Sequence, residues 1–101
     1  LYKLVIELSN KMNFKNNVGI VVGATNEEHL IDIDKVARNL PWLMPGIGFQ
    51  GGNLKKSILT GEKNYLSLIN VSRGILQFKN GTIDNIREAV ENYTSEIRKI
   101  L

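Results

Sequence analysis

Short apolar runs alternate along the chain with stretches in which apolar residues recur every three or four positions. The runs occupy residues 18–22, 42–44 and 65–71. Residues 18–22 are a continuous apolar run rich in β-branched residues, which is typical of a strand buried on both faces of a parallel sheet. The recurring stretches predict helices before, between and after the strands. Their apolar stripes consist of Leu1, Leu4, Val5, Leu8 and Met12; Leu30, Ile33, Val36 and Ala37; and Ile83, Ile86, Ala89, Val90, Tyr93, Ile97 and Ile100. The alternation indicates an α/β fold with a parallel sheet.

Turn and capping residues mark the ends of these helices. Pro41 stops the second helix, and Gly61 ends a short helix over residues 54–59. Thr82 is placed to cap the last helix. Leu1 already falls inside the first apolar stripe, with no cap or turn before it. We therefore expect the chain to be truncated at its N-terminus, within a helix of a larger domain.

The spacing of the strands limits the architecture. Residues 18–101 contain three strand–helix units of about 28 residues each, close to the ~31 residues per unit of a (β/α)8 barrel. This spacing fits part of a (β/α)8 barrel, but a doubly wound sheet has the same spacing. Three parallel strands cannot close a barrel, so we expect the isolated chain to be poorly stable.

A glycine-dense turn, PGIGFQGG over residues 45–52, separates the second strand from the short helix. Glycine loses much conformational entropy on ordering, so four glycines here indicate positive φ angles or a ligand that the backbone approaches closely. The first N–H groups of a helix carry a partial positive charge and bind anions readily. The turn therefore predicts a phosphate site, in which the Gln50 amide could donate to a phosphate oxygen.

A second candidate loop, Ser72-Arg73-Gly74, follows the third strand. In parallel α/β folds ligands bind at the carboxyl ends of strands, and in barrels a phosphate commonly lies between the last two loops. The Arg73 guanidinium can hold a phosphate through two charge-assisted hydrogen bonds, and Gly74 lets the backbone come close beside it. The two loops together predict one phosphate-binding site.

Other nucleotide-binding motifs fit the glycine turn less well. Gly46, Gly48 and Gly51 satisfy G-x-G-x-x-G between a strand and a helix, but the dinucleotide motif expects an acidic residue about 20 positions later. That region carries Ser72 and Arg73 instead, which leaves only an NADP-like alternative. A Walker loop is excluded, because the required Lys and Ser or Thr do not follow Gly51.

Composition narrows the class of protein further. The 101 residues are 43% hydrophobic and 23% charged, as in an ordered globular domain. The net charge of +3 comes from scattered Lys and Arg, which gives little support for nucleic-acid binding. The chain has no cysteine, hence no disulfide or thiolate metal site. No apolar run reaches the ~18 residues of a membrane span, so we expect a cytoplasmic protein without a membrane partner.

Candidate acid–base and metal-binding residues are few. His29, Asp32 and Asp34 are expected on the solvated face of the second helix, and no cluster of His and acidic residues predicts a metal site. Trp42 and Met44 are expected in the core. No residue stands out as a proton donor or nucleophile, so the chain has the pattern of a binding half without a catalytic half.

Three sequence blocks, VGIVVGAT (residues 18–25), PGIGFQGG (45–52) and INVSRGI (69–75), resemble in order and spacing the C-terminal part of orotidine 5′-phosphate decarboxylase. The resemblance implies that residues 1–101 are the C-terminal part of a single TIM-barrel domain, with strands six to eight of a (β/α)8 barrel. It also implies a carbon–carbon lyase of pyrimidine biosynthesis, a homodimer that converts orotidine 5′-monophosphate to UMP without metal or organic cofactor. Another sugar-phosphate-binding barrel enzyme and a non-catalytic phosphate-binding module remain alternatives.

The resemblance also assigns residues. Gln50 matches the glutamine of the phosphate-gripping loop, which contains Gly48 and Gly51, and Arg73 matches the phosphate-binding arginine, with Ser72 and Gly74 beside it. The family's catalytic lysine lies between two aspartates in a D-x-K-x-x-D motif that this chain lacks. The resemblance therefore implies that the catalytic residues lie upstream, that a partner subunit adds one aspartate, and that this segment alone is inactive.

Overall fold

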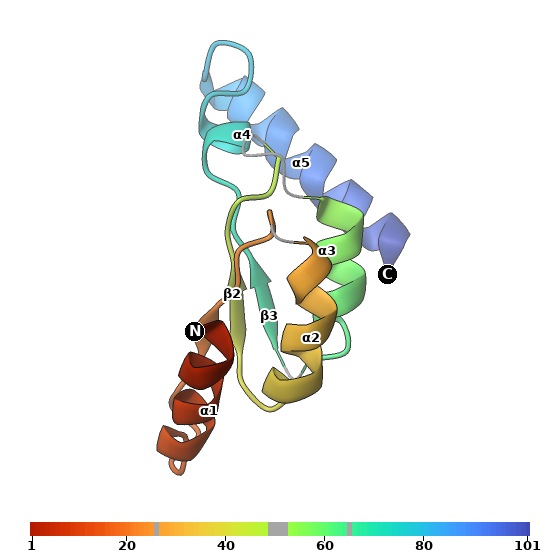
Figure 1. Ribbon diagram of the computed structural model, residues 1–101. Coiled ribbons are helices and arrows are strands. Elements are labelled where there is room, and N and C mark those ends of the chain that lie inside the picture. Colours follow the sequence, from red (N-terminus) through yellow and green to blue (C-terminus); the bar gives the residue numbers. More distant parts are fainter. Residues whose placement is uncertain (26, 49–52, 65) are drawn as a thin grey trace.

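The computed structural model describes residues 1–25, 27–48, 53–64 and 66–101. Five helices and three strands follow one another along this part of the chain (Figure 1). In order they are α1 (Tyr2–Met12), β1 (Ile20–Val21), α2 (Glu27–Ala37), β2 (Trp42–Met44), α3 (Leu54–Gly61), β3 (Ser67–Ile69), α4 (Arg73–Leu76) and α5 (Ile83–Ile100). The predicted alternation of strands and helices is confirmed, but β1 and β3 are shorter than their apolar runs.

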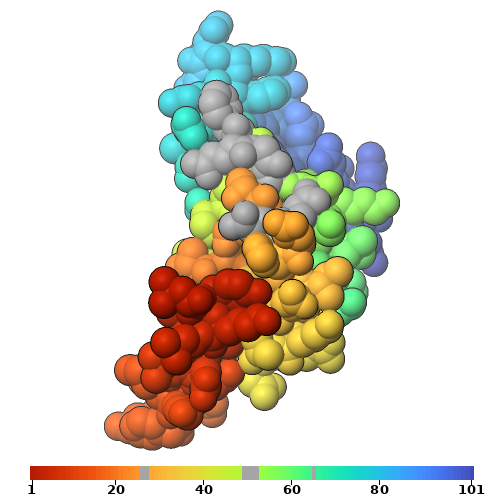
Figure 2. Space-filling view, viewed as in Figure 1, coloured from red at the N-terminus to blue at the C-terminus, as the bar shows by residue number. Residues whose placement is uncertain are grey.

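The strands form one parallel sheet in the order β1-β2-β3. Leu43 pairs with Val21 on one side and with Leu68 on the other. Helices α2, α3 and α5 lie along one side of this sheet (Figure 1), and α1 packs against α2. The molecule is elongated, 45 × 24 × 24 Å, with α1 at one end and the segment between α4 and α5 at the other (Figure 2).

The core lies between the sheet and its helices. Trp42 and Met44 of β2 are almost completely buried, as predicted, together with Leu30 and Ala37 of α2. The Trp42 indole Nε1–H donates a 3.0 Å hydrogen bond to the Ala37 carbonyl. This bond satisfies a buried donor and a carbonyl near the end of α2, so it ties the helix to the strand.

The opposite face of the sheet is not covered. Val21, Leu43 and Leu68, which are register partners, are 69%, 41% and 56% exposed. Successive side chains of a strand point to opposite faces, and the three helices beside the sheet cover only one of them. The prediction that the first strand is buried on both faces is therefore wrong for this chain, because Val21 of β1 is exposed.

In helix α1, too, the apolar residues that predicted the helix are not the ones that are buried. Ile6 is the buried residue of α1, and Tyr2 packs beside it against the core. The apolar stripe that predicted this helix is exposed: Leu1, Leu4, Val5, Leu8 and Met12. The helix itself is confirmed, but the side of α1 that meets α2 is a different one.

Two positions of α2 differ from the prediction. Asp34, expected in solvent, is only 4% exposed, and its Oδ2 accepts a 3.0 Å hydrogen bond from Nη2 of Arg38. Val36, expected inside, is 48% exposed. The buried side of α2 follows Leu30, Asp34 and Ala37, at spacings of four and three residues, which places Val36 off this line. Asp32 is exposed as predicted.

The C-terminal helices are predicted in part. Helix α5 begins after Thr82, whose Oγ1 accepts a 3.3 Å hydrogen bond from the Asn85 N–H, so the predicted cap is confirmed. Ala89 is its buried residue, whereas Ile83 and Val90 are exposed. The short helix α4 was not predicted.

A pair of alanine substitutions in α2 tests which side of this helix faces the core. Leu30→Ala should lower the free energy of unfolding by about 2–5 kcal/mol, because it removes a fully buried side chain. Val36→Ala removes an exposed side chain and should change it by less than about 1 kcal/mol. Urea unfolding followed by circular dichroism measures both, and equal losses would contradict this packing.

Candidate functional site

The first loop of the candidate site begins where β2 ends. Gly46 and Gly48 have φ angles of +91° and +81°, and Ile47 between them is buried. A side chain at such φ angles is strained, so the prediction of positive φ angles in the glycine turn is confirmed at these two positions. Gln50 and Gly51 lie outside the described residues.

Helix α3 starts directly after this loop. The Asn53 side chain accepts a 2.9 Å hydrogen bond from the Lys56 N–H, which caps the first turn. The predicted helix start is confirmed. The amino end of α3 and its partial positive charge therefore lie next to the glycine turn.

The second loop leaves β3 beside the first. The Asn70 N–H donates a 3.0 Å hydrogen bond to the Met44 carbonyl, so β2 and β3 remain paired up to the point where both loops begin. The Asn70 side-chain amide donates to Oγ of Ser72 at 3.3 Å. Arg73 opens α4 and is exposed. Ser72, Arg73 and Gly74 thus lie at the same edge of the sheet as the glycine turn.

Tyr93 of α5 connects the two loops. A Cβ atom added to Gly74 would lie 2.6 Å from the Tyr93 hydroxyl oxygen, and a Cβ atom added to Gly48 would collide with the same oxygen. One hydroxyl is therefore in contact with a glycine of each loop. The structure brings Gly48 and Gly74 together, as the phosphate-site prediction requires, and adds Tyr93, which the sequence suggested only as an apolar helix position.

The chemistry of this site favours anion binding. The described part of the first loop and residues 70–76 contain no acidic residue and no histidine, whereas backbone N–H groups and the Arg73 guanidinium are present. Such donors can hold a phosphate. The described residues of the two loops are therefore suited to binding an anion.

The remaining candidate groups lie elsewhere. His29, on α2, has its ring centroid 5.3 Å from that of Tyr2 and its Nε2 3.8 Å from a Glu28 carboxylate oxygen. The described residues include no group of three His, Cys, Asp or Glu side chains that could hold a metal ion. No helix in the described ranges has the length and apolar character to cross a membrane.

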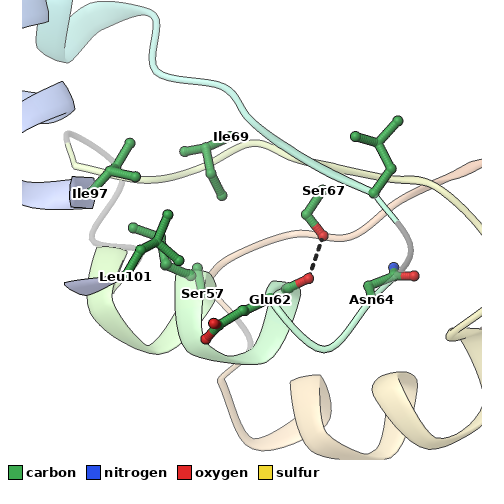
Figure 3. A pocket seen from close by; sticks show the side chains of 10 residues that line it. Ser57, Glu62, Asn64, Ser67, Ile69, Ile97 and Leu101 are labelled. Atoms are coloured by element: carbon green, nitrogen blue, oxygen red, sulfur yellow. Dashed lines mark hydrogen bonds between the residues drawn. The ribbon is translucent and has the colours of Figure 1, made fainter. Parts of the chain in front are cut away.

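A pocket of about 290 Å³ lies between α3, β3 and the end of α5 (Figure 3). Ser67, at the start of β3, donates a 3.1 Å hydrogen bond from Oγ to the Gly61 carbonyl beside it. Much of the lining is apolar, with Ile58, Ile69 and Leu101 among its residues. The pocket lies on the face of the sheet that the helices cover. None of its lining residues belongs to the glycine turn or to the Ser72-Arg73-Gly74 loop.

Comparison with solved structures defines the class of protein. The fold matches part of the UMP synthase of Leishmania donovani with a TM-score of 0.77 and 38% sequence identity. The match covers 99% of this chain and 22% of that protein. The chain therefore has the α/β fold of a segment of a nucleotide-synthesising enzyme. No family model matches the sequence.

Curated relatives identify the family. Orotidine 5′-phosphate decarboxylases of Dehalococcoides mccartyi and Flavobacterium johnsoniae are 36% and 35% identical over 92% and 100% of this chain. The decarboxylase of Haloarcula marismortui is 41% identical over 75% of it. The chain spans 38%, 38% and 27% of these relatives. It is homologous to part of orotidine 5′-phosphate decarboxylase, and the resemblance seen in its motifs is confirmed.

Two glycine substitutions test the geometry of the first loop. Gly48→Ala should cost about 1–2 kcal/mol of unfolding free energy, because alanine is strained at a φ of +81°. Gly23→Ala is the matched control: no heavy atom lies within 4 Å of an added Cβ and its φ is not positive, so it should not destabilise the protein. Thermal or urea unfolding of both variants provides the measurement, and equal stability would contradict the positive φ.

Proposed function

We propose that this chain forms the phosphate-binding part of an orotidine 5′-phosphate decarboxylase, a carbon–carbon lyase that converts orotidine 5′-monophosphate to UMP in pyrimidine biosynthesis. The observation that carries the proposal is the meeting of two glycine-containing loops at one edge of a parallel sheet, in a chain homologous to decarboxylases. Its three strands would be strands six to eight of a (β/α)8 barrel. The exposed ladder of Val21, Leu43 and Leu68 would then face the barrel interior, where inward side chains pack in layers.

The proposed contacts are divided between the two loops. Gln50 and Arg73 would bind the phosphate through their side chains, and Gln50 would also contact the pyrimidine. Gly48, Gly51, Ser72 and Gly74 would bring backbone donors close to it. The exposure of Arg73 and its position at the start of α4, in the loop at the same edge of the sheet as the glycine turn, support this role.

The proposed catalytic residues belong to other parts of the enzyme. A D-x-K-x-x-D motif is absent from the 101 residues, and Asp34-Lys35 lies on α2, with the carboxylate buried against Arg38. We propose that the catalytic lysine and aspartates come from earlier strands, with one aspartate from the second subunit of a cytoplasmic homodimer. This segment would then be inactive alone, and the complete enzyme would need no metal or organic cofactor.

Phosphate binding would contribute to catalysis as well as to affinity. Binding energy from a group remote from the reacting carbon can orient the substrate and close loops around it. The loops that hold the phosphate are built on strand ends, whose positions are determined by the sheet. Loss of a phosphate contact would therefore lower the rate of decarboxylation and not only the occupancy of the site.

A chimeric enzyme tests the proposed function. The decarboxylase of Flavobacterium johnsoniae, which aligns with all of this chain, would have its matching segment replaced by residues 1–101. We expect the chimera to form UMP from orotidine 5′-monophosphate, measured by the loss of orotate absorbance, and the same enzyme without the segment to be inactive. A folded chimera that binds the nucleotide without turnover would contradict the decarboxylase proposal.

The binding preference separates the two alternatives. A decarboxylase segment should bind UMP much more tightly than ribose 5-phosphate, whereas equal affinities would favour another sugar-phosphate enzyme. Phosphate binding by an isolated, ordered and monomeric chain would favour a non-catalytic module. Calorimetric titration of the chimera measures the two affinities, and phosphate titration with analytical ultracentrifugation of the isolated 101-residue chain tests for a module.

Arg73 is tested in the active chimera. Arg73→Ala should lower kcat/KM by about 10²- to 10⁴-fold, because two hydrogen bonds to a charged group contribute about 1.5–3 kcal/mol each. Arg87→Ala is the matched control, because this arginine is exposed on α5 and has no proposed contact with the phosphate. Its Nη1 lies 4.0 Å from Oδ1 of Asp84. Unchanged kinetics of Arg73→Ala with the full nucleotide would rule out its proposed role.

A further inference from the structure

The hydroxyl of Tyr93 occupies a position that neither the motifs nor the proposed phosphate contacts explain. Tyr93 lies on α5, one turn after the buried Ala89, and its side chain is half-buried. Its oxygen is in contact with Gly74 of the second loop and with Gly48 of the first. It is therefore placed between the two segments whose separation determines the size of the proposed site.

Gly48 is restricted by two features and Gly74 by one. Gly48 has a positive φ, so a side chain there is strained whatever surrounds it, and an added Cβ would also collide with the Tyr93 oxygen. Gly74 has no such φ, and its nearest neighbours around an added Cβ are the Tyr93 oxygen at 2.6 Å, Val71 Cγ1 at 3.1 Å and Tyr93 Cζ at 3.4 Å. Without the Tyr93 oxygen, the atom closest to the added Cβ would be the Val71 Cγ1 methyl group. The need for glycine at position 74 is therefore mainly a consequence of Tyr93.

We propose that Tyr93 is a positioning residue whose hydroxyl sets the spacing of the two glycine loops and thereby the geometry of the phosphate site. The assignment of the ligand rests on the proposed function, but the spacing rests on the contacts alone. Packed side chains in contact transmit a change of even one methyl group. The Tyr93 hydroxyl occupies the space that the methyl group of an alanine at position 74 would need. Each group should therefore be able to replace the other.

The ring of Tyr93 also has somewhere to go when it is displaced. A pocket of about 230 Å³ lies beside it, lined by Gly74, Phe78, Ala89, Asn92, Tyr93 and Glu96. A Cβ at position 74 can therefore push the phenol aside without unfolding the protein. We expect the consequence to fall on ligand affinity, because the loops would lose their common contact.

A compensating exchange tests the proposal. Tyr93→Phe and Gly74→Ala should each weaken the binding of UMP and of inorganic phosphate about tenfold, within the range of coupling between contacting residues. The double variant should bind both within about threefold of the parent, because the new methyl group fills the space of the lost hydroxyl. Calorimetric titration of the chimera that carries each variant gives the dissociation constants, and its kinetics give KM and kcat.

Two controls separate spacing from general destabilisation. Gly48→Ala should be restored only in part by Tyr93→Phe, because loss of the hydroxyl removes the collision with the added Cβ but not the strain of a positive φ. Gly61→Ala introduces a comparable crowding, 2.9 Å from Ser67 Oγ and away from Tyr93, so Tyr93→Phe should not relieve it. Unfolding midpoints of all variants show whether an effect on binding has a structural origin, since a purely structural role would shift the midpoints and leave the affinity of the folded protein unchanged.

The remaining outcomes are distinct. Losses that multiply in the double variant would overturn the spacer role and show that the hydroxyl and Gly74 act independently. A compensating pattern in a protein that binds phosphate but forms no UMP would support the spacer and contradict the decarboxylase. If the parent binds neither probe, the proposed phosphate site fails, and additive unfolding midpoints of Tyr93→Phe, Gly74→Ala and the double variant would overturn the spacing as well.

Discussion

The site depends on the parallel pairing of β2 with β3. Met44 and Ile69 are register partners at the ends of these strands, and the Asn70 N–H donates to the Met44 carbonyl just beyond. Both strands therefore end at the same edge of the sheet, and the loops that follow begin side by side. An antiparallel arrangement would place these loops at opposite ends of the sheet, and no single ligand could then touch both.

Burial on one side of the sheet holds this pairing in place. Trp42 and Met44 pack against α2, and the indole hydrogen bond to the Ala37 carbonyl ties the end of that helix to β2. Helix α5 adds a second attachment, because Ala89 is buried while Tyr93, one turn later, meets both loops. The helix layer thus provides stability and also sets the distance across the site.

Two apolar surfaces of this chain, one on the sheet and one on α1, are not covered by other residues. The ladder of Val21, Leu43 and Leu68 and the apolar stripe of α1 are exposed in this chain. Apolar surface stabilises a folded protein only when other atoms cover it and remove it from water. The relatives, of which the chain spans 38% or less, are long enough to supply such cover. This is the arrangement proposed for a segment of a barrel, whose strands are apolar on both faces.

The sequence by itself determined the order of strands and helices, the start of the short helix after the glycine turn, the cap at Thr82, the positive φ angles in the glycine turn and the family. These features depend on residues close together in the chain, which act through local backbone geometry. Gln50 and Gly51 remain predictions. Only the tertiary structure decided which apolar residues are covered, that Asp34 is buried beside Arg38, that α4 forms, and that Tyr93 reaches Gly48 and Gly74. Apolar periodicity shows which residues can be buried, whereas burial itself depends on neighbours distant in sequence.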